Sequence, residues 1–169
     1  MPLEISEDIV SLAYQSLGYF VIEGRGVGVR EIDLLALRLG DNGQVAERLH
    51  VEVSVSTRPI GVLREKAPLG TSARHPDASA QAWAGKKFDQ ESVKKVVKSA
   101  FGTDNFKRVF VHGRLKEPAQ LKALEAKGIE CVAIGDLVNR ALESGTANRL
   151  RRALEISALL TGRTQASSV

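Results

Sequence analysis

The first third of the chain has a hydrophobic pattern typical of one helix followed by three strands. Residues 6–8 combine a capping serine with two acids, and apolar residues then recur at helical spacing as far as Gly18, so we expect a helix over residues 6–17. Runs rich in β-branched and other apolar residues follow at 19–22, 31–39 and 49–56. The turn sequence at 40–43 separates the last two runs, which therefore predict an antiparallel pair.

The rest of the chain alternates between helical and strand patterns after a long irregular segment. Residues 57–80 hold three prolines and two glycines, too many for a regular element, and predict a loop. Residues 81–101 have helical periodicity, with Asp89 as an alternative restart. Strand patterns at 108–112 and 129–134 then alternate with helical patterns at 118–127 and from 136 to about 160. This order, αβββαβαβα, predicts an α/β fold with a mixed sheet of about five strands between helices.

The composition fits a single domain over residues 1–160. Of the 169 residues, 43% are apolar, which is enough for one sizeable core, and the polar stretch 161–169 indicates a disordered tail. The single cysteine, Cys131, excludes an internal disulfide framework, and no apolar run is long enough to span a bilayer. We therefore expect a cytoplasmic protein without a membrane partner.

The positive charge of the chain is concentrated in one segment. The formal net charge is +4, and residues 86–108 contain seven basic residues against three acidic ones. On a helical wheel of this segment, Lys87, Lys94 and Lys98 share one flank. Such a flank suits contacts with nucleic-acid phosphates, although an ordinary solvated helix face has the same pattern.

Two acidic residues interrupt otherwise apolar strand patterns. Asp33 lies within the run 32–37, and Glu52 lies within the run 51–55. Each acid taken singly is more simply explained by a solvated strand face. On adjacent antiparallel strands, however, the two can lie close enough to bind one Mg²⁺, which can position water and offset the charge on a phosphodiester. Glu7 on the first helix is a candidate third acid.

The order and spacing of these residues resemble a known nuclease motif. In sequence order its parts are Glu7-Asp8, Gly18-Tyr19, Gly24-Arg25-Gly26, the run from Glu31 to Ala36, and Val51-Glu52-Val53. This pattern resembles the PD-(D/E)XK nuclease superfamily, and within it the YraN-like and Holliday-junction-resolvase-like members. The resemblance implies a restriction-endonuclease-like three-layer sandwich with metal-dependent endonuclease activity on DNA, Mg²⁺ or Mn²⁺ as cofactor, and a homodimer. It also implies that Asp33 and Glu52 bind the metal and that Glu7 assists them.

One position departs from the family motif. The family has a lysine two residues after the second acid, where this chain has Ser54, which cannot supply positive charge. On the helical wheel, Lys86 falls in the middle of the apolar stripe that contains Val93 and Val97, and some family members carry the lysine on this helix. We therefore expect Lys86 to replace the strand lysine as a catalytic residue. Alternatively, Lys86 extends from the helix end into solvent, or Asp89 begins a new helix and the wheel does not reach Lys86.

These observations leave more than one function open. The first is a metal-dependent endonuclease in which Arg25 and Arg30 of the glycine-rich segment, together with the lysine flank, contact DNA phosphates. The second is a catalytically degenerate nuclease fold that serves as a nucleic-acid-binding or assembly module, which Ser54 favours. The third is an unrelated α/β protein whose acids are surface residues.

Overall fold

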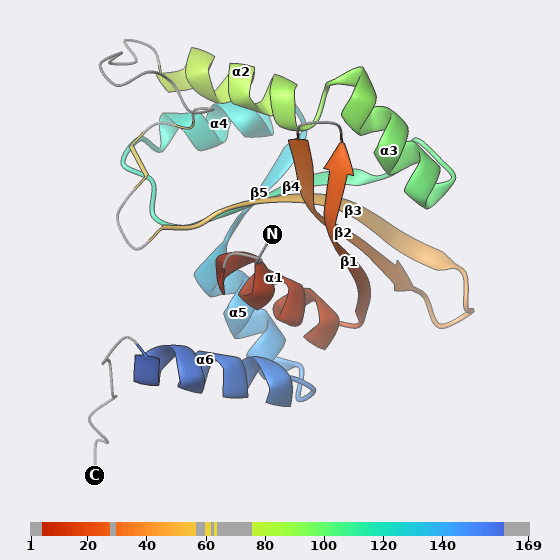
Figure 1. Ribbon diagram of the computed structural model, residues 1–169, viewed down its shortest axis with the longest axis vertical. Helices are drawn as coiled ribbons and strands as arrows, with labels where there is room; N and C mark the ends of the chain where they lie inside the picture. Colours follow the sequence, from red (N-terminus) through yellow and green to blue (C-terminus); the bar gives the residue numbers. More distant parts are fainter. Residues whose placement is uncertain (1–4, 28–29, 57–59, 62, 64–75, 161–169) are drawn as a thin grey trace.

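The computed structural model describes residues 5–27, 30–56, 60–61, 63 and 76–160 (Figure 1). In these ranges the helices are α1 (Ile5–Ser16), α2 (Pro76–Lys87), α3 (Glu91–Phe101), α4 (Ala119–Glu125), α5 (Ile134–Glu143) and α6 (Asn148–Leu160). The strands are β1 (Tyr19–Val27), β2 (Arg30–Leu39), β3 (Val45–Ser54), β4 (Lys107–His112) and β5 (Ile129–Ala133).

The strands form one mixed sheet in the order β1-β2-β3-β4-β5. The pairs β1/β2 and β2/β3 are antiparallel, whereas β3/β4 and β4/β5 are parallel. Parallel neighbours need a crossover connection, which α2 with α3 provides for the first parallel pair and α4 for the second. The predicted α/β class and the mixed sheet of about five strands are confirmed.

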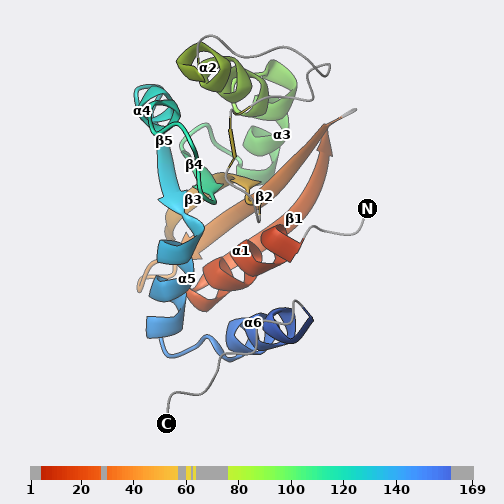
Figure 2. The same ribbon diagram turned by 90° about the vertical axis from the view of Figure 1, so that its left-hand side faces the viewer.

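Helices cover both faces of this sheet (Figures 1 and 2). On one face, α1, α5 and α6 pack over a core that includes Leu34, Val51 and Val111. On the other face, α2, α3 and α4 pack over two clusters, represented by Phe110 and Leu35. Because successive side chains of a strand point to opposite faces, β2, β4 and β5 contribute to the cores of both layers. The three-layer arrangement expected from the sequence is therefore the one observed.

The segment predicted as one helix over residues 81–101 is two helices. α2 ends at Lys87, and α3 begins at Glu91. Between them, Phe88 is 1% exposed and packs edge-on against the rings of Trp83 and His50. Burial of this aromatic ring at the junction turns the chain, so the new helix starts two residues after Asp89, the alternative restart.

The segment predicted as one helix from 136 to about 160 is also two helices, α5 and α6. Gly145 lies between them with a φ of 77°, a backbone conformation that ends a helix at low cost only for glycine. The hydroxyls of Ser144 and Thr146 donate hydrogen bonds of 3.0 Å and 2.6 Å to the carbonyl oxygen of Ser16. This corner thereby attaches to the end of α1.

Some predictions fall outside what the structure describes. The predicted tail, 161–169, and most of the predicted loop lie outside the described residues. The backbones of Arg25 and Arg30 belong to β1 and β2, but their side chains are outside the described part of the structure. The described helices include none with the length and apolar character needed to cross a membrane. The homodimer and the cellular compartment stay predictions.

Candidate functional site

Asp33 and Glu52 lie side by side on β2 and β3. The antiparallel register pairs Leu34 with Val51, and its continuation by one residue sets Asp33 beside Glu52. Leu34 and Val51 belong to the core under α1, so the two acids face the opposite layer. Asp33 is 9% exposed, Glu52 is 1% exposed, and Asp33 Oδ2 accepts a 2.8 Å hydrogen bond from the N–H of Val53. Neither acid lies on a solvated face, so the interpretation of both as surface residues is wrong.

Lys87 is a cation that contacts both carboxylates. Its Nζ lies 2.5 Å from Glu52 Oε2 and 3.6 Å from Asp33 Oδ1, and 31% of its side chain is exposed. The helical periodicity of the sequence predicts Lys86 at this position, but Lys86 is exposed. The helical wheel assumes one helix over 81–101, and the end of α2 at Lys87 breaks that assumption. A lysine of this helix does approach the acids, one residue later than predicted.

His50 is a neighbour of the site that the sequence analysis does not select. It is fully buried on β3, between the rings of Phe88 and Phe106, and its Nε2 lies 3.2 Å from Glu52 Oε1. Burial lowers the pKa of His50 to about 4, so the ring is neutral at pH 7. We place its proton on Nε2 because an ionised carboxylate oxygen can only accept. The alternation of strand side chains could have indicated this contact, since His50 and Glu52 are two residues apart.

Among the described residues, the acidic groups of the site outnumber the basic ones. Burial raises the pKa of both carboxyls to about 7, and repulsion from Glu52 adds to the effect at Asp33, while Lys87 lowers both values. Burial opposes the charge on Lys87, but the attraction of Glu52 and Asp33 exceeds this and raises the pKa of its ammonium. Within the described ranges, one cation thus faces two buried carboxyls, an arrangement that favours either a shared proton or a second cation.

The residues present suit a hard divalent cation. Among the described residues, Glu52 Oε2 is buried and accepts no hydrogen bond of good geometry, although Lys87 is its ion-pair partner. Carboxylate oxygens are the donors that Mg²⁺ and Mn²⁺ prefer, and Mg²⁺ is often held by one or two carboxylates and several waters. Asp33 and Glu52 supply such a pair.

Glu7 does not complete a three-ligand site. It lies on α1, which packs on the opposite face of the sheet from α2 and α3. Within the described ranges, no group of three or more His, Cys, Asp or Glu side chains is placed to hold a metal ion. Glu7 is therefore not part of a three-ligand group in the described ranges, and its assisting role stays a prediction.

The lysines predicted to contact phosphate separate into two groups. Lys87 forms an ion pair with the buried carboxylates, whereas Lys94 and Lys98 lie on the exposed surface of α3. Lys94 forms a 3.5 Å ion pair with Glu91, and Lys98 forms one of 2.5 Å with Asp104. These acids offset part of the positive charge, so the surface of α3 is less basic than the wheel suggests.

Comparisons with known proteins show no family for this chain. No family model and no curated protein matches the chain. Among solved structures, a protein of unknown function, AF1548, is 16% identical with a TM-score of 0.47, over 77% of this chain and 58% of its own. A repair endonuclease from Pyrococcus abyssi is 13% identical with a TM-score of 0.39, over 75% of this chain and 43% of its own. The chain thus spans less than two thirds of either structure, and its function is inferred from its own residues.

Proposed function

We propose that this chain is a divalent-metal-dependent phosphodiesterase that cleaves nucleic acid, with DNA as the substrate class that the sequence resemblance implies. The observation that carries the proposal is the contact of Lys87 with both carboxylates of Asp33 and Glu52. The family motif requires two acids and one lysine together. Here α2 supplies the lysine, and β3 has Ser54 in its place.

Each side chain has a distinct task in this proposal. Asp33 and Glu52 would hold Mg²⁺ or Mn²⁺, which supplies positive charge for the phosphate oxygens and lowers the pKa of a bound water. The ammonium of Lys87 adds a second positive charge where the attacked phosphate becomes more negative. His50 Nε2 contacts Glu52 Oε1 and would thereby fix the orientation of the carboxylate that would hold the metal.

The electrostatics of the site favour a functional role over a structural one. A buried ion pair that serves stability balances its charges, because an uncompensated buried carboxylate is costly. Two carboxyls share one lysine among the described residues, and the pKa of each carboxyl is raised to about 7, so ionisation of both is unfavourable in the folded chain. Groups with strongly shifted pKa values and a specific charged partner concentrate at functional sites.

A degenerate nuclease fold that binds nucleic acid without cleaving it is the second candidate. Two observations favour it: Ser54 replaces the motif lysine, and no third acidic ligand joins Asp33 and Glu52 among the described residues. This candidate predicts binding that does not depend on the two carboxylates.

The test is cleavage of end-labelled duplex, single-stranded and branched DNA, with Mg²⁺ or Mn²⁺ and with EDTA. We expect wild-type protein to cleave at least one of these substrates in the presence of metal, and Glu52→Gln to give no product. Glu91→Gln is the matched control, because it makes the same chemical change at a side chain that is 91% exposed. Binding of DNA without cleavage by wild-type protein favours the second candidate. Equal cleavage by wild-type protein and Glu52→Gln would exclude this site.

A further inference from the structure

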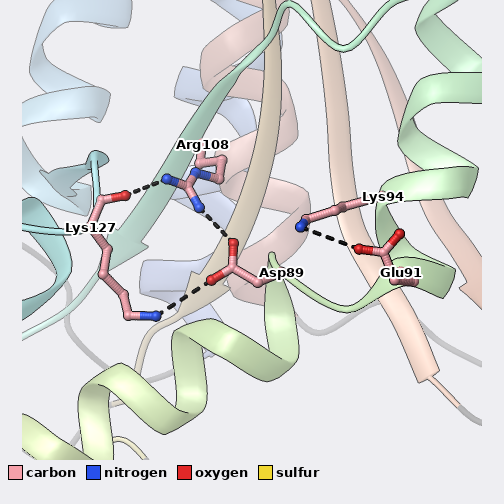
Figure 3. A network of polar contacts seen from close by, with 5 residues as sticks. All are labelled: Asp89, Glu91, Lys94, Arg108 and Lys127. Atoms are coloured by element: carbon pink, nitrogen blue, oxygen red, sulfur yellow. Dashed lines mark hydrogen bonds and ion pairs between the residues drawn. The ribbon is translucent and has the colours of Figure 1, made fainter.

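The junction between α2 and α3 is fixed by a charged cluster that the sequence does not suggest (Figure 3). Asp89, two residues after Lys87, accepts a 2.7 Å hydrogen bond on Oδ1 from Nη1 of Arg108 in β4. Its other oxygen, Oδ2, lies 3.4 Å from the Nζ of Lys127, which follows α4. A single carboxylate thus joins the end of α2 to two other elements of the fold.

A second contact, between Arg108 and the backbone of Lys127, also holds this cluster together. Arg108 Nη2 donates a hydrogen bond to the carbonyl oxygen of Lys127. The next residue, Gly128, has a φ of 72°, and a Cβ at that position would lie 3.4 Å from Arg108 Nη2. Glycine therefore suits this place both for its backbone conformation and for the space that the guanidinium occupies. The side chains of Asp89, Arg108 and Lys127 are each about one third exposed.

The backbone connects this cluster to Lys87. The N–H of Asp89 donates to the carbonyl oxygen of Gly85 at 3.2 Å, and the N–H of Phe88 donates to that of Ala84 at 2.9 Å. These bonds extend the last turn of α2, on which Lys87 stands. Helix ends fray when nothing holds them, because their last turn has lost half of its hydrogen bonds. Asp89 ties this turn to β4 and to the segment after α4.

We propose that Asp89, held by Arg108 and Lys127, is a positioning residue that keeps the ammonium of Lys87 between the carboxylates of Asp33 and Glu52. Its catalytic consequence rests on the proposed nuclease function, whereas the position of Lys87 can be measured without any activity. A lysine on a helix end has a long flexible side chain, so a fixed backbone is needed to place its charge.

The test measures the acylation rate of Lys87 by an amine-reactive ester, with mass spectrometry of the modified peptides. Lys86 is exposed and adjacent, so it serves as an internal reference. In the wild-type protein we expect Lys87 to react more slowly than Lys86. In Asp89→Ala we expect the rate at Lys87 to rise about fivefold relative to Lys86, the factor that corresponds to about 1 kcal/mol for a partly exposed ion pair.

Two further variants keep the test decisive. Glu91→Ala removes a carboxylate from the start of α3 that pairs with Lys94, and we expect it to leave the Lys87 rate unchanged. If Asp89→Ala does not fold, Lys127→Ala removes the longer of the two ion pairs, and we expect a smaller increase at Lys87. The proposal is overturned if Asp89→Ala folds and its acylation rate at Lys87 is unchanged. If Asp89→Ala does not fold, an unchanged acylation rate at Lys87 in Lys127→Ala overturns it.

Enzyme kinetics separate this proposal from the proposed function. If wild-type protein cleaves DNA, we expect Asp89→Ala to lower kcat with little change in KM, because Asp89 acts through Lys87 and does not contact the substrate. We expect Asp89→Glu to retain part of the wild-type kcat. An unchanged kcat together with faster acylation would contradict a role for Asp89 in catalysis. Faster acylation in a protein without any nuclease activity supports the positioning of Lys87 and counts against the nuclease function alone.

Discussion

Asp33→Asn is expected to abolish metal-dependent cleavage and, at the same time, to make the folded chain more stable at pH 8. Activity falls by at least about 10²-fold because the site loses one of two metal-binding carboxylates and its charge. Stability rises because Glu52 and Lys87 then form a balanced ion pair. The amide oxygen of the asparagine can still accept the hydrogen bond from the N–H of Val53.

The gain in stability of Asp33→Asn increases with pH, because the pKa of Asp33 is higher in the folded chain than in the unfolded chain. The carboxyl releases its proton near its ordinary pKa of 3.8 in the unfolded chain and near about 7 in the folded chain. Between these values the folded wild-type chain binds more protons, so its free energy of unfolding decreases as the pH rises. The variant has no such group, and its advantage grows from pH 4 to pH 7 and is constant above.

Urea unfolding at pH 5 and pH 8 measures this advantage. At pH 8 we expect a gain of about 2 kcal/mol in the free energy of unfolding, below the limit of about 4 kcal/mol that the full change in pKa would give. A smaller gain is expected at pH 5. If Asp33 is instead part of a stabilising ion pair, the variant will be less stable than wild-type protein at pH 8.

Lys87→Met is expected to cause the second large effect, with no counterpart at the neighbouring lysine. Removal of the ammonium takes away the cation that contacts both buried carboxylates in the described part of the structure. Because Lys87 is partly exposed, we expect the lower end of the range for a broken buried pair, about 3 kcal/mol of lost stability at pH 8. Cleavage falls by about 10²-fold or more, since one positive charge near the phosphate is lost.

Lys86→Met is the matched control, because it makes the same change one residue earlier at an exposed position. We expect it to change the free energy of unfolding by less than about 0.5 kcal/mol and to leave cleavage unchanged. Thermal and urea unfolding with cleavage assays on both variants give the comparison. The reverse pattern, with Lys86→Met inactive and Lys87→Met active, would show that the lysine has been assigned to the wrong residue.

Much of the fold follows from local patterns. The helix over α1, the antiparallel pair β2/β3 and the parallel strands β4 and β5 match their predictions because each has a clear period and a clear turn signal. The errors are two helix breaks. Gly145 could have indicated one of them, whereas the break before α3 depends on Phe88 entering a core built from α2, β4, α4 and β5.

The carboxylate pair follows from the sequence more directly than the rest of the site does. Asp33 and Glu52 are acids in apolar strands joined by a turn, and strand alternation together with the register of the pair brings them to one face. The observed lysine, Lys87, is one residue after the predicted Lys86, because a helical wheel assumes a continuous helix and cannot account for a helix break caused by tertiary packing. Contacts such as that of Asp89 with Arg108 join residues far apart in the chain, and no local period predicts them.

The most direct test of the metal site is a calorimetric titration of the folded protein with Mn²⁺ at pH 8, where both carboxyls are largely ionised. We predict that one Mn²⁺ binds per wild-type chain and that Glu52→Gln weakens binding at least about tenfold, whereas Glu91→Gln does not. Absence of Mn²⁺ binding by wild-type protein, or equal binding by wild-type protein and Glu52→Gln, would contradict a metal site at Asp33 and Glu52.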